Sequence, residues 1–463
     1  MPVNSFDNYP MTWKPDRDVL THPYYLSLAE QLEEEIKSGR LSPGTLLPPQ
    51  RELADFLDVN FTTITRTYNT CKQKGLIYGI TGKGTFVAPH AAEKIRIYVS
   101  DLDNGCIELG AVNGFSEYSE LVEKATQSVV AKGYLRNLYD YHHPLGHPHQ
   151  LAAGLRWMEQ MGVHSDSEHT AIFAGAQNAL TIALISLFSP GDKIATDKYT
   201  YSNMIELAKL LNIVLIPIEG DTHGMIASEL QKQCRRQKIN GVYLMPSCSN
   251  PTSICIPIDR RKELASVIKE QDLILIEDDV SAWLSTAYKI PTTSMFDIIP
   301  DQSLYICATT KSLCPGLRIA FMAFSEKFKE KILNGFYNIN IKTSSLDAEI
   351  ITELILNGDA YRIAENKRDL AKKACLLFDE YFPNCRHDKD FVTYYCWLPI
   401  DTDKPFYEVE DDLAKLGVRI YHSNRFAVAN DDKQSYLRVS LSSAGSMPKL
   451  KKALGILRDY LNS

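Results

Sequence analysis

The segment 308–318, ATTKSLCPGLR, follows a short apolar run at 303–307 that has the composition of a buried strand. It places Lys311 seven residues before Arg318, with a Pro-Gly turn between them. A lysine amine attacks aldehydes, and a guanidinium holds phosphate through a forked, permanently charged contact. The pair therefore suits a ligand that carries both an aldehyde and a phosphate, and pyridoxal 5′-phosphate (PLP) carries both.

Similar apolar runs alternate with amphipathic segments from about residue 165 onward. The expected strands are 171–174, 193–196, 213–218, 241–246, 273–276 and 303–307. Strands separated by helices predict a mostly parallel sheet with helices on both faces, in which ligands gather at the carboxyl ends of the strands. Polar residues follow these runs, namely Gln177, Tyr201, Asn250, Asp278 and Lys311. We expect them to converge at one edge of the sheet.

The first 90 residues have a different pattern. Helical spacing or composition predicts helices over 24–40, 50–57 and 61–74, followed by strands over 76–80 and 85–87. The turn 58–60 separates the second and third helices, and Asn60 is placed to cap the third. Two helices, a turn, a third helix and a two-stranded wing predict a winged helix-turn-helix.

Composition sets further bounds. The 463 residues are 44% hydrophobic and 23% charged, as in ordinary globular proteins, and the formal net charge of −7 confines any nucleic-acid surface to part of the chain. The ten cysteines have no metal-ligand spacing, so we expect reduced thiols, no metal site and a cytoplasmic protein. Without a signal peptide or an apolar run near 18 residues, no membrane segment is expected.

The stretch PPQRELADFLDVNFTTITRTYNTCKQKGLIYGITGKGTFV (48–87) resembles the DNA-binding domain of the GntR family. The resemblance implies contacts with promoter DNA from Arg51, Thr62, Thr63, Thr65, Arg66, Lys83 and Gly84. Two positions depart from the family pattern: Pro49 replaces a serine, and Asn60-Phe61 replaces Ser-Arg, so one phosphate-binding arginine is absent. The alternative use of such a module is binding to another protein.

Residues from about 105 to 463 resemble a fold-type I PLP-dependent aminotransferase. Five motifs carry this resemblance in order: YHHPLGHPHQLAAGLR (141–156), SNPTS (249–253), EDDVSAW (277–283), TTKSLCPGLRIAF (309–321) and LRVSLS (437–442). Together with the GntR-type head, they make the chain similar to MocR-type transcriptional regulators. The expected fold is thus multidomain, with a winged helix-turn-helix before an α/β PLP-dependent transferase fold that ends in a smaller α/β subdomain.

The aminotransferase resemblance implies roles for residues of the lysine and carboxylate motifs. Lys311 would form the internal aldimine, Arg318 would hold the phosphate, and Asp278 would pair with the pyridine nitrogen. Glu277 and Asp279 are the rivals of Asp278. By the same resemblance, Asn250 would contact the 3′ oxygen of PLP, and Tyr201 would stack on its ring, with Tyr199 as the rival of Tyr201. The phosphate would be contacted by Thr310, by the backbone of Ala176 and Gln177, and, from the partner in a dimer, by Tyr141. Arg438 would bind the α-carboxylate of an amino acid.

Three further positions depart from the aminotransferase pattern: Val280 replaces a tyrosine, Ala308 a serine and Ser253 a glycine. PLP binding is still expected, whereas efficient transamination is not. We therefore expect a homodimeric regulator in which an amino acid, an amine or PLP is sensed by aldimine exchange at Lys311, with at most a residual aminotransferase half-reaction. The alternatives are an active aminotransferase with a winged-helix module, and a DNA-binding protein that has lost PLP. The expected domains are a DNA-binding domain at 1–87, a linker at 88–105 and a PLP-binding domain at 106–463. Within the PLP-binding domain, we expect a large part at about 165–325 and a small part at about 326–463.

Overall fold

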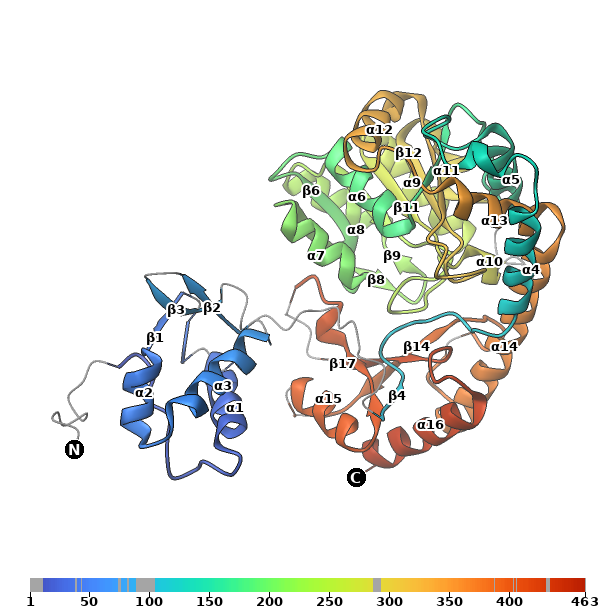
Figure 1. Cartoon of the computed structure of the whole chain (residues 1–463). Coiled ribbons are helices and arrows are strands. Elements are labelled where there is room, and N and C mark those ends of the chain that lie inside the picture. The colour runs from blue at the N-terminus through green and yellow to red at the C-terminus, as the bar shows by residue number, and fades with distance from the viewer. Residues whose placement is uncertain are drawn as a thin grey trace. The chain divides into compact units, whose positions relative to one another are not determined.

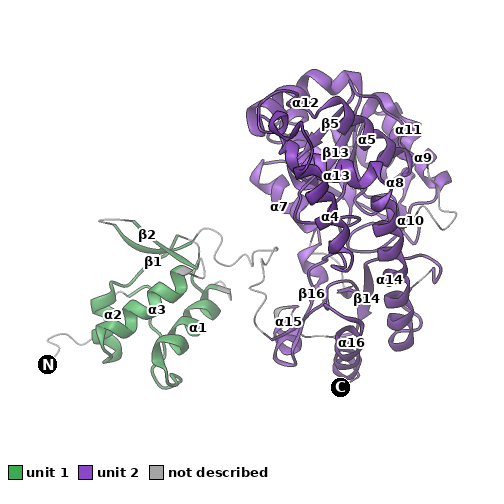
Figure 2. Ribbon diagram, turned by 45° about the vertical axis from the view of Figure 1, so that its right-hand side comes forward, with its two compact units in different colours: residues 1–99 green, residues 100–463 purple. Residues whose placement is uncertain are grey.

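The computed structural model describes residues 11–462 except 38–39, 43, 74–75, 81–82, 89–104, 286–292, 387, 403, 405 and 430–433. The chain divides into two compact units, Met1–Val99 and Ser100–Ser463 (Figure 2). Most of the expected linker, residues 89–104, lies outside the described residues.

The first unit contains three helices and a small antiparallel sheet. The helices are α1 (Tyr24–Lys37), α2 (Gln50–Leu57) and α3 (Phe61–Gln73), and the strands β1 (Leu46–Leu47), β2 (Ile77–Ile80) and β3 (Gly84–Val87) pair in the order β1-β3-β2. This confirms the winged helix-turn-helix. Strand β1 was not predicted, because two residues carry no periodicity.

Apolar side chains at helical spacing build the core of this unit. Leu28, Leu32 and Ile36 of α1 are fully buried, whereas Leu26, which shares their pattern, is exposed. Asn60 Oδ1 accepts a hydrogen bond from Thr62 N at 2.9 Å, so a side chain satisfies one free amide at the start of α3. The chain therefore enters α3 with its first turn fixed.

The second unit is built on a seven-stranded sheet (Figure 1). Its order is β5 (Thr170–Phe173), β13 (Ala320–Phe324), β12 (Ser303–Ala308), β11 (Ile274–Asp278), β10 (Gly241–Leu244), β6 (Lys193–Asp197) and β7 (Val214–Ile218). All six expected strands are present. Strand β13 is antiparallel to both neighbours and was not predicted, because it returns directly after the lysine segment instead of after a helix.

Helices cover both faces of this sheet. One face packs against α6 (Ala176–Leu187) and α12 (Glu326–Ile339), and the other against α8 (Ala227–Arg236) and α9 (Ile258–Glu270). The unit also contains α4 (Ser119–Val130), α5 (Pro148–Glu159), α7 (Ser202–Leu210), α10 (Ala282–Ser285), α11 (Met295–Ile298), α13 (Ser345–Leu356) and the hairpin of β8 (Gly220–Asp221) and β9 (Gly224–Met225). Short 3-10 turns lie at Leu135–Leu138, Pro300–Gln302 and Ser423–Arg425.

A smaller part closes the chain. Its antiparallel sheet has the order β14 (Tyr395–Ile400), β17 (Ser435–Ser440) and β16 (Tyr421–His422), and β15 (Val418–Arg419) pairs with β4 (Ile107–Glu108). The helices of this part are α14 (Asp359–Tyr381), α15 (Phe406–Lys415) and α16 (Met447–Leu461). Within the described residues, no helix has the length and apolarity needed to cross a bilayer.

Candidate functional site

Three consecutive carboxyl groups lie buried at the end of β11, and hydrogen bonds distinguish them. Glu277 accepts from the amides of Met295 and Phe296, at 3.1 and 2.7 Å. Asp279 accepts from Ser247 N at 3.3 Å and from its hydroxyl. Asp278 Oδ2 accepts from Tyr243 OH at 2.8 Å, but its Oδ1 is buried and has no hydrogen-bond partner among the described residues.

Because its Oδ1 lacks a hydrogen-bond donor, Asp278 is the one of these three carboxylates that can accept a hydrogen bond from a ligand. Burial raises the pKa of Asp278 to about 7. A buried acceptor without a donor is costly, so an incoming N–H group would both satisfy Oδ1 and favour the ionised carboxylate.

Lys311 lies just beyond β12, next to β11 in the sheet, and its Nζ donates to the carbonyl oxygen of Val112. Burial lowers the pKa of Lys311 to about 8, aided by the cationic Arg438 and Arg318. An amine with this pKa is unprotonated more often near neutral pH than an ordinary lysine, and is therefore a better nucleophile.

An anion cradle lies at the start of α6. Gly175 precedes the helix with a φ of +91°, and among the residues that the structure describes no side chain caps the first amides, which belong to Ala176 and Gln177. The guanidinium of Arg318 lies against Gly175, because a Cβ there would come within 2.6 Å of Nη2. Free amides at a helix N-terminus beside a guanidinium form a binding site for phosphate. Thr310, in the same segment as Arg318, is buried.

Arg438 on β17 is buried, with an exposed fraction of 5%. Its guanidinium donates to Asn250 Oδ1 at 2.8 Å and to Gly110 O at 2.6 Å, while Nε has no partner, and the described residues provide no ion pair for it. The ring of Phe426 lies 4.4 Å from Cζ. Burial lowers the pKa of Arg438 to about 10, which is still well above neutral pH. The guanidinium therefore stays charged and suits an incoming carboxylate.

The two rival tyrosines lie in different surroundings. Tyr201 immediately precedes α7 and lies within electrostatic reach of Asp278; burial, together with this carboxylate, raises the pKa of Tyr201 to about 12. The ring of Tyr199 instead packs 5.2 Å from that of Trp397 and 5.9 Å from that of Tyr436, both in the smaller part. Of the two tyrosines, Tyr201 is thus the one whose hydroxyl senses the Asp278 carboxylate.

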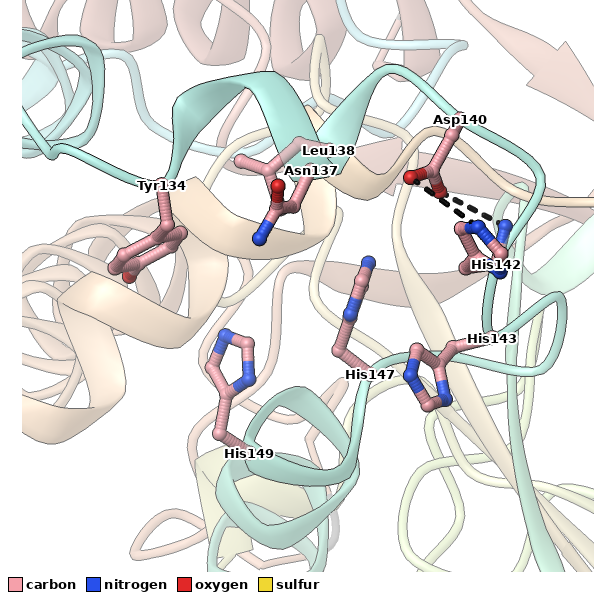
Figure 3. A pocket seen from close by; sticks show the side chains of 8 residues that line it. All are labelled: Tyr134, Asn137, Leu138, Asp140, His142, His143, His147 and His149. Carbon is pink, nitrogen blue, oxygen red and sulfur yellow. Dashed lines mark hydrogen bonds and ion pairs between the residues drawn. The ribbon is translucent and has the colours of Figure 1, made fainter.

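Tyr141 is not brought to this site within one chain; its side chain is 79% exposed. The same loop borders a pocket of about 640 Å³ lined by Tyr134, Asn137, Leu138, Asp140, His142, His143, His147 and His149 (Figure 3). The pocket is polar, and it does not contain Lys311, Asp278 or Arg438.

In the first unit, the residues expected to contact DNA lie on α2, α3 and the wing. Arg51, Thr62, Arg66, Lys83 and Gly84 are exposed, and Thr63 and Thr65 are half-buried. The hydroxyl of Thr65 donates to Gln50 Oε1 at 2.9 Å, which ties α3 to α2. Phe61, at the position of the absent arginine, is 45% exposed.

Sequence reasoning missed Tyr243 and the carbonyl groups of Gly110 and Val112. Tyr243 is an aromatic residue in an apolar strand, and nothing in that pattern shows that its hydroxyl meets Asp278. Backbone carbonyls have no residue signature at all, so their contacts with Lys311 and Arg438 become visible only in the fold.

The fold and the site together define a DNA-binding module joined to an aminotransferase scaffold. Residues 24–87 match the family described as bacterial regulatory proteins, gntR family, and residues 111–457 match aminotransferase class I and II. The uncharacterized HTH-type transcriptional regulator YdeF of Bacillus subtilis (strain 168) is 33% identical over all of this chain and 99% of its own length. YjiR of Escherichia coli (strain K12), also described as an uncharacterized HTH-type transcriptional regulator, is 26% identical over 78% of this chain and 82% of its own length.

The chain belongs to the GntR-type helix-turn-helix transcriptional regulators that carry an aminotransferase class I and II domain, the MocR-type architecture. The GntR-type domain is a DNA-binding domain, and PLP is the cofactor of the aminotransferase class I and II fold.

Solved aminotransferases share the fold of the second unit. An archaeal alanine:glyoxylate aminotransferase superposes with a TM-score of 0.71 at 18% identity, over 77% of this chain and 91% of that one. LysN, the α-aminoadipate aminotransferase of Thermus thermophilus, superposes with a TM-score of 0.70 at 19% identity, over 77% of this chain and 92% of that one.

Proposed function

We propose that this protein is a transcriptional regulator that binds promoter DNA through residues 1–87 and PLP through residues 106–463, with 88–105 as linker. An amine or amino-acid effector, or PLP itself, would change its affinity for DNA. The observation that carries this proposal is the open, buried Oδ1 of Asp278 at the end of β11, the strand beside the one that leads to Lys311, together with the Arg318 cradle at α6. These residues fit the ring nitrogen, aldehyde and phosphate of PLP.

When bound, PLP supplies an aldehyde that exchanges one primary amine for another. Lys311 Nζ is the amine that this chain offers, and its lowered pKa keeps a neutral fraction available. Asp278 would hold the ring N–H, Asn250 the 3′ oxygen and Tyr201 one face of the ring.

The phosphate would be held by Arg318, the amides of Ala176 and Gln177, and Thr310. Arg438, a buried cation with no ion pair among the described residues, would receive the carboxylate of an amino-acid effector. An effector amine without a carboxylate would leave Arg438 on Asn250 and Gly110.

A homodimer is part of this proposal. Tyr141 extends from its loop with four-fifths of its surface exposed, as expected of a side chain that reaches the phosphate of a second copy. Two copies would also present two winged helices, which matches the two-fold symmetry of paired DNA half-sites.

We do not assign a physiological transaminase activity. Val280 and Ala308 lack the hydroxyl groups that the aminotransferase pattern places there, so sustained turnover is not expected. An aminotransferase with an accessory winged helix is the competing function, and one experiment separates the two. PLP-loaded protein is incubated with amino donors and keto acids, and its binding to the DNA upstream of its own gene is measured. Operator binding without sustained turnover supports the regulator, whereas turnover without DNA binding overturns it.

A further inference from the structure

The segment that follows residues 89–104 crosses the ligand site. We call residues 110–113 the strap. Just before it, β4 pairs with β15, and α16 packs against both strands, so the strap starts on the smaller part. In Figure 1 the teal trace that leaves β4 runs toward α4 between the seven-stranded sheet and the smaller part.

Each of the four carbonyl oxygens of the strap accepts a hydrogen bond from a side chain. Arg438 donates to Gly110 at 2.6 Å, Ser443 to Ala111 at 2.7 Å, Lys311 to Val112, and Ser442 to Asn113. Three of these donors belong to the smaller part. Lys311 follows β12 of the large sheet, so its bond to Val112 ties the strap to the end of that sheet.

Hydrogen bonds and close packing of its own give the strap a defined shape. The amides of Gly110 and Ala111 donate to Glu108 Oε1 at 2.7 and 2.8 Å, and that of Asn113 donates to Ser443 Oγ at 2.8 Å. Gly110 packs so closely on Tyr421 that a Cβ would come within 2.6 Å of the ring. Such a fixed element transmits a change at one end instead of absorbing it.

The groups that hold the strap are also the groups that the ligands need. Lys311 Nζ cannot both join PLP and keep its present bond to Val112 O. Arg438 has an open Nε for a carboxylate, so its bond to Gly110 and the two serine contacts remain when an effector binds. PLP binding therefore removes one of the four side-chain bonds to the strap, the one from Lys311.

We propose that the strap is a latch that couples the ligand site to the DNA-binding unit, an inference that rests on the proposed function. In the PLP-free protein, Lys311 fastens the strap to the large sheet. Lys311 would leave Val112 to hold PLP, which would unfasten the strap from the large sheet and loosen its hold on β4. Because residues 89–104 connect β4 to the first unit, the loosened element is the one to which the DNA-binding unit is attached.

The first test is hydrogen–deuterium exchange of the full chain with and without PLP, with the visible absorbance of lysine-bound PLP recorded in parallel. We expect the amides of residues 110–113 to exchange about fivefold to tenfold faster once PLP is bound, while Leu109, which donates to Arg419 O in the β4–β15 pair, is unchanged. Full absorbance without faster exchange would overturn the latch and leave the PLP site intact. No absorbance would overturn the PLP site, and the latch with it.

The second test uses Ser443→Ala, which removes two strap bonds without touching Lys311 or Arg438. We expect fast exchange in the strap before PLP is added, normal PLP absorbance, and at least about a threefold smaller effect of PLP on DNA affinity. Ser128→Ala, which loses a bond to Glu353 away from the strap, is the control and should behave as wild type. An undiminished PLP effect in Ser443→Ala would contradict the latch.

Discussion

The guanidinium of Arg318 lies against the backbone of Gly175, so closely that the space for a Cβ is taken. This contact joins the lysine segment to the N-terminus of α6. We predict that Gly175→Ala lowers PLP affinity by about tenfold or more, because the methyl group displaces the guanidinium from the cradle. PLP titration followed by visible absorbance measures the effect.

Gly191→Ala is the matched control for that variant. Gly191 has a φ of +89°, close to the +91° of Gly175, but open space surrounds its missing Cβ. Both variants should lose about 1 kcal/mol of stability through backbone strain. Equal PLP affinities for the two variants would show that Arg318 does not bind the phosphate.

Asp278→Asn should have opposite effects on stability and on ligand binding. The pKa of Asp278, raised from 3.8 to about 7, means that the folded protein binds this proton more tightly than the unfolded one, so stability falls as pH rises through this range. Asparagine stays neutral, and the PLP-free variant should therefore be more stable than wild type at about pH 8, on the order of 3 kcal/mol, with the difference shrinking to below about 1 kcal/mol at about pH 4.

The same variant should bind PLP at least about tenfold more weakly, since an amide does not stabilise a protonated ring nitrogen. Thermal unfolding at the two pH values and PLP titration measure the two effects. A variant that gains stability and keeps full PLP affinity would remove Asp278 from the site.

The pH dependence of PLP attachment should follow Lys311. Its pKa of about 8 predicts that the attachment rate rises as pH passes through that value, well below the range of an ordinary lysine. Arg438→Gln removes a nearby positive charge and should move the midpoint upward. Arg458→Gln, an exposed arginine on α16, should leave it in place. Stopped-flow absorbance measures the midpoint, and an unshifted profile in Arg438→Gln would separate Arg438 from Lys311.

Residue patterns predicted much of this molecule. Helices and strands with clear periodicity, and the edge of the sheet where polar residues gather, followed from spacing and from short motifs. Patterns did not decide between Asp278 and its two neighbours, because that choice depends on which buried carboxyl already has its donors. The strap was also out of reach, since carbonyls contacted by Lys311 and Arg438 belong to a segment about 200 and 330 residues away.

Phe61 offers a test of the DNA-binding surface. It opens α3 in place of the family's arginine, and its side chain is accessible. We predict that Phe61→Arg strengthens binding to promoter DNA and steepens the dependence of log K on log salt by about 1, as expected for one added phosphate contact. Arg66→Ala should have the reverse effect. Fluorescence anisotropy at several salt concentrations measures both, and slopes that do not change would indicate that α3 does not face DNA.

We expect the ligand site to control DNA binding through Lys311. The most direct measurement is the affinity of wild type and Lys311→Ala for the DNA upstream of the gene, without ligand, with PLP, and with PLP plus an amino-acid mixture. Ligand should change the DNA affinity of wild type by at least about fivefold and leave that of Lys311→Ala unchanged. Equal responses in the two proteins, or no response in wild type, would contradict it.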